Sequence, residues 1–254
     1  MLNKTNSSDN TKFKGHELFI AQMKDQFNLV RRRRQNVLTS FLTLSEQEIL
    51  LKIKPKDIYI EFISGYEQGI RKIACISDIE GDIESDVVIL ESDYDSRFKQ
   101  LEHKDLLGAI MHLGIEREMI GDLLVEKEHL YILTKECVAN YLIDSLYQIG
   151  RSSVSFSKVD SFSCTKPQYE EIKVNSASLR ADALIACLAH TSRSKAMEYI
   201  KHGFVKVNDI VLEENTVLCY KDIVSIRRVG RFQLIELEGT TRKDRMVFKF
   251  YKFI

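Results

Sequence analysis

The sequence lacks the long apolar runs that mark membrane-spanning and secreted chains. Its 254 residues contain no stretch of about 18 consecutive apolar residues, the length that a transmembrane helix needs. Residues 1–14 are polar and contain no apolar core of a secretory signal. At 44% hydrophobic residues, the chain still has enough apolar side chains for one to three folded cores. These features predict a cytoplasmic globular protein without a membrane partner.

Cysteine is scarce, and its spacing matches no known framework. The five cysteines form no C-x-x-C pair and have no histidine at the spacing of a zinc site. They are Cys75, Cys137, Cys164, Cys187 and Cys219. This distribution excludes a disulfide scaffold of the usual kind and predicts reduced, mostly buried thiols with no bound metal.

Motifs of catalysis and cofactor binding are also missing. The chain has no G-x-G-x-x-G, G-x-x-x-x-G-K-[ST], H-E-x-x-H or G-x-S-x-G segment. His103 and Asp105 flank a predicted helix start, but no third polar residue accompanies them, so a capping cluster is favoured over a catalytic pair. We therefore expect a protein that is not an enzyme, with no cofactor and no small-molecule substrate.

The formal net charge is zero, yet the charge is unevenly distributed. Residues 175–254 carry 14 Lys and Arg against 9 Asp and Glu, whereas residues 1–174 carry 23 against 28. The basic C-terminal part is therefore the expected nucleic-acid face, because phosphate is attracted to clustered cations.

The chain divides into segments of different periodicity. Apolar residues from Phe19 to Leu50 recur every three or four positions, which predicts a helical domain over residues 1–70 with a capping box at Ser45 and Glu48. Residues 71–160 alternate between strand and helix patterns in the order β-α-β-β-α-β once a first strand at Lys72–Ile76 is set aside, and the last strand is predicted at Ser153–Ser157. That order predicts a ferredoxin-like domain, the plan also used by RNA-recognition-motif domains. Residues 161–174 lack periodicity and are predicted to be a linker.

The C-terminal segment, residues 175–254, begins with two predicted amphipathic helices followed by predicted short strands, one of them at Val217–Leu218. Ala181, Leu184, Ile185 and Leu188 lie on one face of the first helix, and Ala196, Tyr199 and Ile200 repeat the pattern in the second. Ser178 and Ser192 are the expected N-caps. The cations that follow these caps lie where the helix dipole disfavours positive charge, so an anionic partner such as phosphate would stabilise them. They are Arg180, Arg193 and Lys195.

Four spaced elements of this segment resemble the S-four RNA-binding domain. They are Ser178-Leu179-Arg180, Ser192-Arg193-Ser194-Lys195-Ala196, Gly203-x-Val205-x-Val207-Asn208 and Asp222-Ile223-x-Ser225. The resemblance implies a helix–turn–helix packed on a small curved sheet, with basic residues that grip structured RNA. Two positions depart from that pattern, because Lys221 and Arg228 stand where the family tends to have glycine. At the first position the turn needs a compensating geometry, because lysine reaches a positive φ at a greater cost than glycine. The second position adds charge where RNA is expected to lie.

Further motifs extend the resemblance to nearly the whole chain. The segments are His103-Lys104-Asp105-Leu106-Leu107-Gly108-Ala109, Gly114-Ile115-x-Arg117, Ile120-Gly121-Asp122 and Gly230-Arg231-Phe232, and they are similar to the bacterial YlmH family. The overall expectation is an α+β protein with an N-terminal helical segment, a ferredoxin-like middle domain and a C-terminal S-four domain. The resemblance implies binding to rRNA of the large ribosomal subunit and to tRNA or peptidyl-tRNA, in ribosome-associated quality control. It further implies a monomer when the protein is off the ribosome.

These arguments nominate two sets of RNA-contacting residues. The main set is Arg180, Ser192, Arg193, Ser194, Lys195, Lys206, Asn208, Arg227, Arg228 and Arg231. The secondary set is Arg31, Arg32, Arg33, Arg34, His103, Lys104 and Arg117. For the four consecutive arginines a solvated helix is an equally good explanation, since residues on a helix spread around it by about 100° each. Two alternative functions stay open: an RNA-modifying enzyme, of the pseudouridine synthase or methyltransferase type, and a scaffold linked to cell division.

Overall fold

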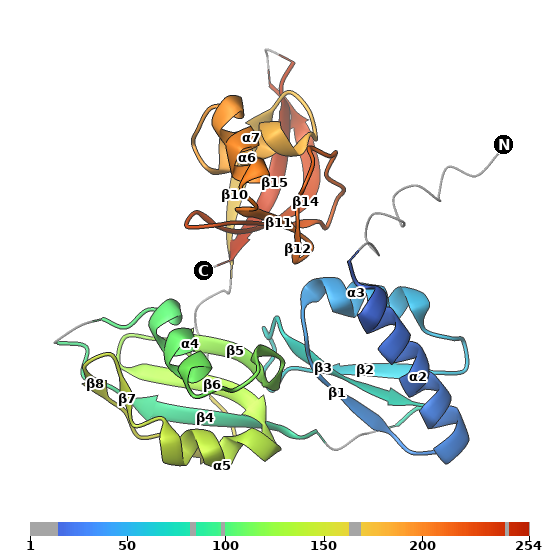
Figure 1. Cartoon of the computed structure of the whole chain (residues 1–254), viewed down its shortest axis with the longest axis vertical. Helices are drawn as coiled ribbons and strands as arrows, with labels where there is room; N and C mark the ends of the chain where they lie inside the picture. The colour runs from blue at the N-terminus through green and yellow to red at the C-terminus, as the bar shows by residue number, and fades with distance from the viewer. Residues whose placement is uncertain (1–14, 82–84, 98–99, 163–168, 242–243, 254) are drawn as a thin grey trace. The chain divides into compact units, whose positions relative to one another are not determined.

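The structure is a computed structural model that describes residues 15–253, except 82–84, 98–99, 163–168 and 242–243. The chain forms two compact units, one made of Met1–Gly15 with Lys166–Ile254 and the other of His16–Thr165. Both contain helices and antiparallel sheets (Figure 1), so the predicted mixed α+β class is confirmed. Within the described ranges, no helix is both long and apolar enough to cross a membrane.

The unit His16–Thr165 begins with a three-stranded sheet. Helix α2 (Glu17–Arg33) and helix α3 (Leu44–Ile53) share one core with the sheet, whose strand order is β1-β3-β2. Its strands are β1 (Val37–Leu42), β2 (Tyr59–Ile63) and β3 (Lys72–Ser77). The prediction that residues 1–70 are helical is therefore wrong for β1 and β2. Val37, Phe41 and Leu42 fit a helical spacing, but the segment has only six residues and pairs with β3.

Two boundaries in this part differ from the sequence prediction. The capping box of α3 is Thr43 with Glu46, not Ser45 with Glu48: the Glu46 amide donates to Thr43 Oγ1 at 3.3 Å and the Thr43 amide to Glu46 Oε2 at 2.7 Å. In addition, β3 pairs with β1 and β2. The predicted start of the middle domain at residue 71 is thus too early, because this strand completes the first sheet.

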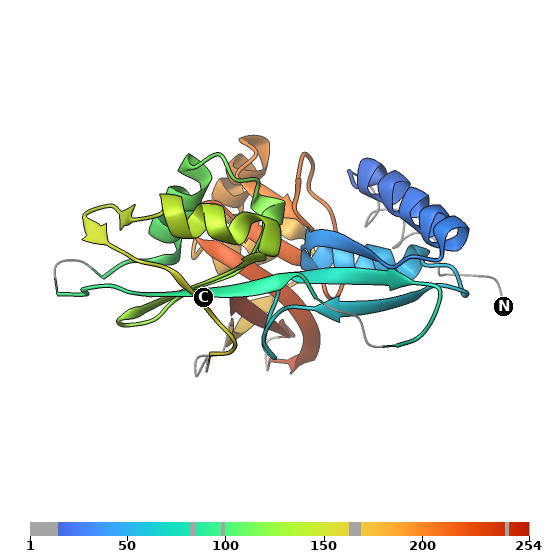
Figure 2. The same cartoon turned by 90° about the horizontal axis from the view of Figure 1, so that it is seen from below.

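The second sheet of this unit has the strand order β5-β6-β4-β9. The first half of this part contains β4 (Val87–Asp93), α4 (His103–His112), the 3-10 turn η1 (Arg117–Met119) and β5 (Ile120–Val125). The second half contains β6 (His129–Lys135), α5 (Glu136–Ser145), a small hairpin of β7 (Gln148–Ile149) and β8 (Ser152–Ser153), and finally β9 (Ser157–Val159). The predicted order β-α-β-β-α-β is confirmed. The last strand, predicted at Ser153–Ser157, is instead split between β8 and β9. Figure 2 shows α4 and α5 on one face of this sheet.

A buried carboxylate joins the two sheets of this unit. Asp122 at the start of β5 is 8% exposed, and its oxygens accept hydrogen bonds from the Ile70 amide (2.6 Å), the Arg71 amide (3.1 Å) and the Tyr66 hydroxyl (3.0 Å). Arg71 in turn donates to the carbonyl oxygens of Phe41 and Ile120. A shared apolar cluster lies beside them, formed by Phe41, Ile73, Ile89, Leu124, Tyr131 and Leu133. The two sheets therefore behave as one folded unit.

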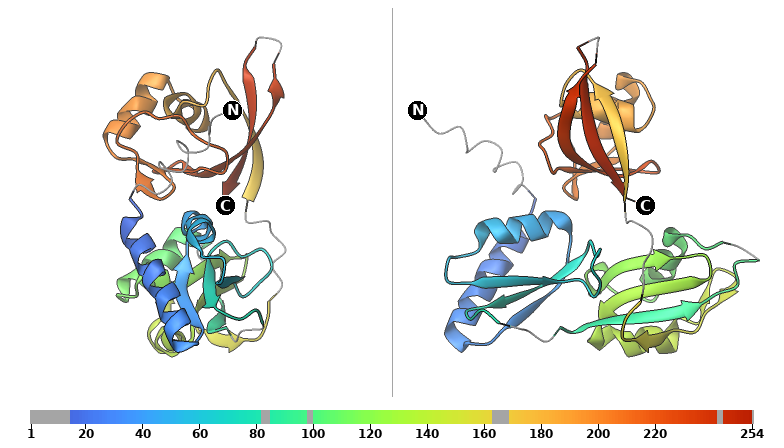
Figure 3. Two further views of the ribbon diagram at one scale, coloured as in Figure 1. Left: turned by 90° about the vertical axis from the view of Figure 1, so that its right-hand side faces the viewer. Right: turned by 180° about the vertical axis from the view of Figure 1, so that it is seen from behind.

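The C-terminal unit is built on a six-stranded antiparallel sheet with the order β10-β15-β14-β13-β11-β12. Its elements are β10 (Tyr169–Ser176), α6 (Ala181–Leu188), α7 (Arg193–Lys201), β11 (Val205–Val207), β12 (Ile210–Val211), β13 (Ile223–Ile226), β14 (Gly230–Thr240) and β15 (Met246–Phe253). Figure 3 shows α6 and α7 on one side of the long strands β10, β14 and β15. Val217 forms only an isolated bridge with Arg180, so the predicted strand at Val217–Leu218 is absent.

The predicted linker at residues 161–174 is wrong over its second half. Residues 169–174 belong to β10, which pairs with β15 along eight residues, from Tyr169 opposite Phe253 to Ser176 opposite Met246. Only Ile172 and Val174 face the core with apolar side chains, and the partner strand is distant in sequence, so local periodicity is weak. Residues 163–168 lie outside the described residues.

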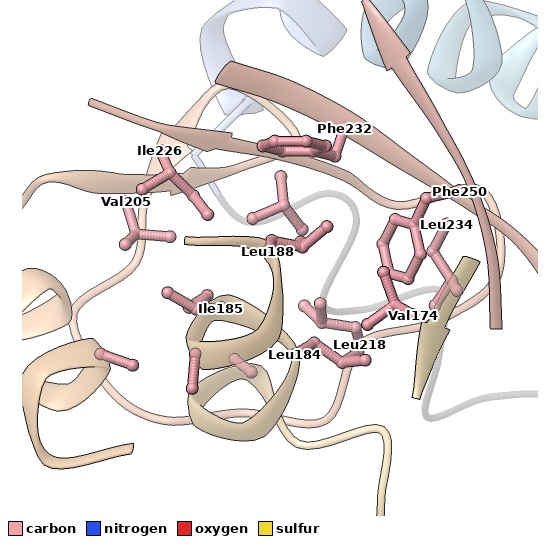
Figure 4. Packing of buried hydrophobic residues seen from close by; sticks show 14 of the residues in the cluster. Val174, Leu184, Ile185, Leu188, Val205, Leu218, Ile226, Phe232, Leu234 and Phe250 are labelled. Atoms are coloured by element: carbon pink, nitrogen blue, oxygen red, sulfur yellow. The ribbon is translucent and has the colours of Figure 1, made fainter. Parts of the chain in front are cut away.

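The core of this unit confirms the predicted helix faces. Ala181, Leu184, Ile185 and Leu188 of α6 are buried, as are Ala196 and Ile200 of α7. Figure 4 shows the side chains of α6 packing against those of the strands. Phe248 and Phe250 of β15 are fully buried here. This packing fixes the starts of both helices relative to the sheet.

Candidate nucleic-acid interface

The starts of α6 and α7 meet at a buried carboxylate. Asp182, in the first turn of α6, is 6% exposed. It accepts hydrogen bonds from Arg180 Nε at 3.1 Å and from Arg193 Nη2 at 2.8 Å. The predicted conflict between cations and helix dipoles is therefore relieved within the chain. The predicted cap at Ser178 is wrong, because Arg180 occupies the N-cap position of α6 and makes no side-chain cap bond.

The environment of Asp182 keeps it ionised. Burial raises the pKa of Asp182, but hydrogen bonds with Asn215, Arg180 and Arg193 outweigh that effect and hold its pKa below the usual value. One carboxylate thus orients two guanidinium groups, each more than half exposed, and the trio keeps a net positive charge. Such oriented guanidinium groups are well suited to binding phosphate oxygens.

The start of α7 agrees with the sequence prediction. Ser192 is its N-cap, and Ser192 Oγ accepts a hydrogen bond from the Lys195 amide at 3.2 Å. The Lys195 ammonium group pairs with Glu198 at 2.8 Å across an exposed turn of the helix. Ser194 is exposed on the same turn. Exposed pairs of this kind are weak and can exchange for other anions.

Three nominated cations have no acidic partner in the part of the chain that the structure describes. Arg227 and Arg228 form the turn between β13 and β14, and Lys206 lies on β11; all three are exposed. Strand pairing brings them together, since Val205 lies opposite Ile226 and the Arg227 amide donates to the Phe204 carbonyl at 2.8 Å. Their charge is therefore fully available to a ligand.

Two other nominated residues have structural bonds. Asn208 has φ of 52°; its side chain donates to Asp222 Oδ1 at 2.9 Å and accepts from the Ile223 amide at 3.0 Å. Asn208 therefore acts first as a turn former. Arg231 pairs with Asp209 at 3.1 Å and lies over the Phe253 ring.

The two departures from the family pattern lie at left-handed backbone positions. Lys221 has φ of 73° and Arg228 has φ of 65°, values that favour glycine. Arg228 thus keeps a cation at a position where any residue with a Cβ atom costs conformational energy.

The secondary set in the other unit is mostly held by internal partners. Arg31 makes two hydrogen bonds to Asp57, Arg34 pairs with Asp78, and Lys104 pairs with Glu102. Arg117 donates to the carbonyl oxygens of Ile120 and Gly121. Arg32 and Arg33 are exposed and make no ion pair with any residue that the structure describes. Of the secondary set, Arg32 and Arg33 therefore have the charges that are most available to a ligand.

The capping cluster favoured for His103 and Asp105 is confirmed for Asp105 alone. The Glu102 amide donates to Asp105 Oδ2 at 2.9 Å, and Glu102 is the N-cap of α4. His103 is the first residue of the helix and its side chain is exposed, but partial desolvation of the ring, together with the nearby Arg117 guanidinium group, lowers its pKa. Among the described residues, no group of three or more His, Cys, Asp and Glu side chains is arranged to hold a metal ion.

The structure also reveals an aromatic residue that the sequence did not single out. Tyr131 lies on the central strand β6 and stacks on Phe162, with 4.5 Å between the two ring centroids. The ring centroid of Tyr66 lies 5.1 Å from that of Phe162. Burial, followed by the hydrogen bond with Glu91, raises the pKa of Tyr131 to about 12. Because its ring is already covered by Phe162, this face of the sheet offers no free stacking platform at Tyr131.

Comparisons with known proteins show which family the chain resembles. A family model described as "Putative RNA-binding domain in YlmH" matches residues 82–163. The chain is 32% identical over 241 residues to the "Ribosome-associated protein quality control protein P2" of Bacillus subtilis (strain 168), covering 91% of this chain and 93% of that protein. Its fold is similar to that of "Cell division protein ylmH from Streptococcus pneumoniae", with a TM-score of 0.50, 21% identity, and coverage of 57% of this chain and 92% of that one. On the strength of the Bacillus subtilis relative, which matches nearly the whole chain, this protein belongs to the YlmH family.

Proposed function

We propose that this protein is a non-catalytic factor that binds the rRNA of the large ribosomal subunit and acts in ribosome-associated quality control of stalled nascent chains. The observation that carries the proposal is the group of exposed, unpaired cations Lys206, Arg227 and Arg228 on the C-terminal unit. The printed name of the Bacillus subtilis relative supports the ribosomal setting. The tRNA of a stalled peptidyl-tRNA is the second expected partner.

In this proposal the C-terminal unit is an S-four domain and the sheet β5-β6-β4-β9 belongs to a ferredoxin-like domain. Two helices followed by a hairpin-rich antiparallel sheet support the first assignment. The strand order and the element order β-α-β-β-α-β support the second. The fold itself does not decide function, so the proposal depends on the surface chemistry.

Phosphate contacts supply most of the binding energy in this account. Each cation that neutralises a phosphate releases a counterion, so binding weakens as salt rises. Arg180 and Arg193, oriented by Asp182, add two further guanidinium groups near the start of α7. The main contacts are therefore expected from the C-terminal unit, with Arg32 and Arg33 as secondary contacts.

Co-sedimentation with purified large subunits over a range of salt concentrations tests the proposal. The informative variant is Arg227→Glu with Arg228→Glu, because neither reversal leaves a carboxylate of the described chain without its partner. The matched control is Lys24→Glu with Lys127→Glu, which makes the same change in net charge at exposed residues of the other unit. We expect the Arg227→Glu, Arg228→Glu variant to bind large subunits weakly, with little dependence of binding on salt. The control should bind like the wild-type chain and keep its salt dependence. Equal binding by wild type and the first variant would overturn the proposal.

A further inference from the structure

Arg227 lies over an aromatic ring at the edge of the cation group. Its guanidinium carbon is 5.2 Å from the centroid of the Phe204 ring. His202 lies 5.6 Å from the same ring at an interplanar angle of 31°, and Tyr199 lies 6.2 Å away. Phe204 is half-buried, whereas Arg227 and His202 are exposed. A planar cation is thus held against an aromatic platform at the surface.

Backbone hydrogen bonds hold Arg227 close to Phe204. The Arg227 amide donates to the Phe204 carbonyl, and the Phe204 amide donates to the Tyr199 carbonyl at 2.9 Å. These bonds tie the end of α7, the start of β11 and the β13–β14 turn together. The contact between Arg227 and Phe204 is therefore present before any ligand binds, which reduces the entropy cost of binding.

Arg227 differs from the other arginines of the surface in what holds it. Arg180, Arg193 and Arg231 are each held by a carboxylate. Arg227 is held by a ring instead and pairs with no acid in the described part of the chain. Its guanidinium group therefore keeps its full charge, and because the residue is exposed it can be reached by a flat group.

We propose that the Arg227–Phe204 pair is a stacking site for one unpaired nucleobase of the bound RNA. Lys206 and Arg228 contact the phosphates on either side of that nucleotide. Guanidinium planes and aromatic rings are the usual platforms for splayed-out RNA bases, and bases inside a duplex cannot reach them. This inference rests on the proposed RNA binding and narrows its ligand to folded RNA that presents an unstacked nucleotide.

Three matched RNA hairpins test the inference by fluorescence anisotropy with the full chain. One carries a single bulged nucleotide, the second carries an abasic residue at the bulge, and the third is fully paired. The abasic hairpin keeps every phosphate, so only the base differs. We expect the wild-type chain to bind the bulged hairpin at least about fivefold more tightly than the abasic one.

Two conservative variants assign that preference to the site. Arg227→Lys keeps the charge and Phe204→Leu keeps an apolar side chain. With either variant we expect the affinities for the bulged and the abasic hairpin to become nearly equal. Binding of the fully paired hairpin should stay salt-dependent. Tyr147→Leu, at an exposed tyrosine of the other unit, is the matched control and should keep the preference. Arg227 is exposed, so its variant stays informative if Phe204→Leu fails to fold.

The outcomes separate this inference from the proposed function. Equal wild-type affinity for bulged and abasic hairpins, with strong salt dependence, would overturn the stacking site and leave RNA binding intact. Failure to bind any of the three hairpins, together with loss of subunit co-sedimentation, would remove the proposed function as well. Displacement of the RNA by a polyglutamate peptide whose own binding depends on Phe204 would assign the site to an acidic protein segment and contradict the inference.

Discussion

Asp182 and Arg193 lie on different helices, yet their charged groups meet at 2.8 Å between Arg193 Nη2 and Asp182 Oδ2. The carboxylate is buried and the guanidinium group is largely exposed. A helix-start cation that would otherwise be disfavoured by the helix dipole is thereby stabilised and aimed outward. This pair connects the stability of the C-terminal unit with its capacity to bind phosphate.

Replacing Asp182 with asparagine should destabilise the C-terminal unit by about 1–2 kcal/mol at pH 7, since charged hydrogen bonds to Arg180 and Arg193 are lost. Urea unfolding and hydrogen exchange of α6 and α7 measure the change. The pKa of Asp182 is lowered in the folded state, so its contribution is present above the unfolded pKa and is lost as pH falls through the folded pKa. The difference between wild type and Asp182→Asn should therefore be constant above about pH 5 and shrink below about pH 4. Glu213→Gln, an exposed control, should change little.

Arg228→Gly should separate stability from RNA binding. Glycine relieves the left-handed φ of 65°, although it also gives the unfolded chain more freedom, so we expect a gain of up to about 1 kcal/mol. RNA affinity should fall at the same time, because a cation is removed. Arg228→Ala should lose affinity without gaining stability. A glycine variant that is less stable than the alanine variant would contradict this reading of the turn.

Asp122→Asn should destabilise the unit His16–Thr165 by about 2–3 kcal/mol, because an amide replaces a carboxylate that accepts three hydrogen bonds. Urea unfolding followed by hydrogen exchange of β3 and β5 provides the measurement. Asp144→Asn at an exposed position of α5 is the matched control. Loss of protection in β5 alone, with β3 unaffected, would show that the two sheets are not coupled through Asp122.

The thiols of Cys75 and Cys137 should react very differently with iodoacetamide. Burial in β3, with a smaller effect of Glu61, raises the pKa of Cys75 to about 11, so almost no thiolate exists at pH 8. Cys137 is exposed on α5. Mass spectrometry of labelled peptides should find Cys137 modified first and Cys75 only after unfolding. Comparable labelling of both thiols in the folded chain would contradict the burial of Cys75 in β3.

Short-range patterns in the sequence correctly predicted the features that depend on residues close together in the chain. The Ser192 cap, the buried face of α6 and the alternation of strands and helices after Val87 each follow from short-range periodicity or capping. The strand Val37–Leu42 did not follow, because its helical spacing is overridden by pairing with β3 more than thirty residues later. The strand Tyr169–Ser176 was missed for the same reason, since its partner is the last strand of the chain.

The chemistry of the candidate surface was only partly predictable. Clustered cations at two helix starts indicated an anion, but no sequence pattern showed that Asp182 supplies one internally to Arg180 and Arg193. The contact of Arg227 with Phe204 was equally hidden, because it depends on strand pairing between β11 and β13. The charge that remains available lies at Lys206, Arg227 and Arg228, outside the two helix starts.

The most direct test of the central claim is ultraviolet crosslinking of the full chain to large ribosomal subunits, followed by mass spectrometry of the crosslinked peptides and sequencing of the RNA. We predict that the crosslinked peptides fall mainly between Arg180 and Arg231 and carry rRNA of the large subunit. Crosslinks confined to residues 16–162, with none in the C-terminal unit, would contradict the account.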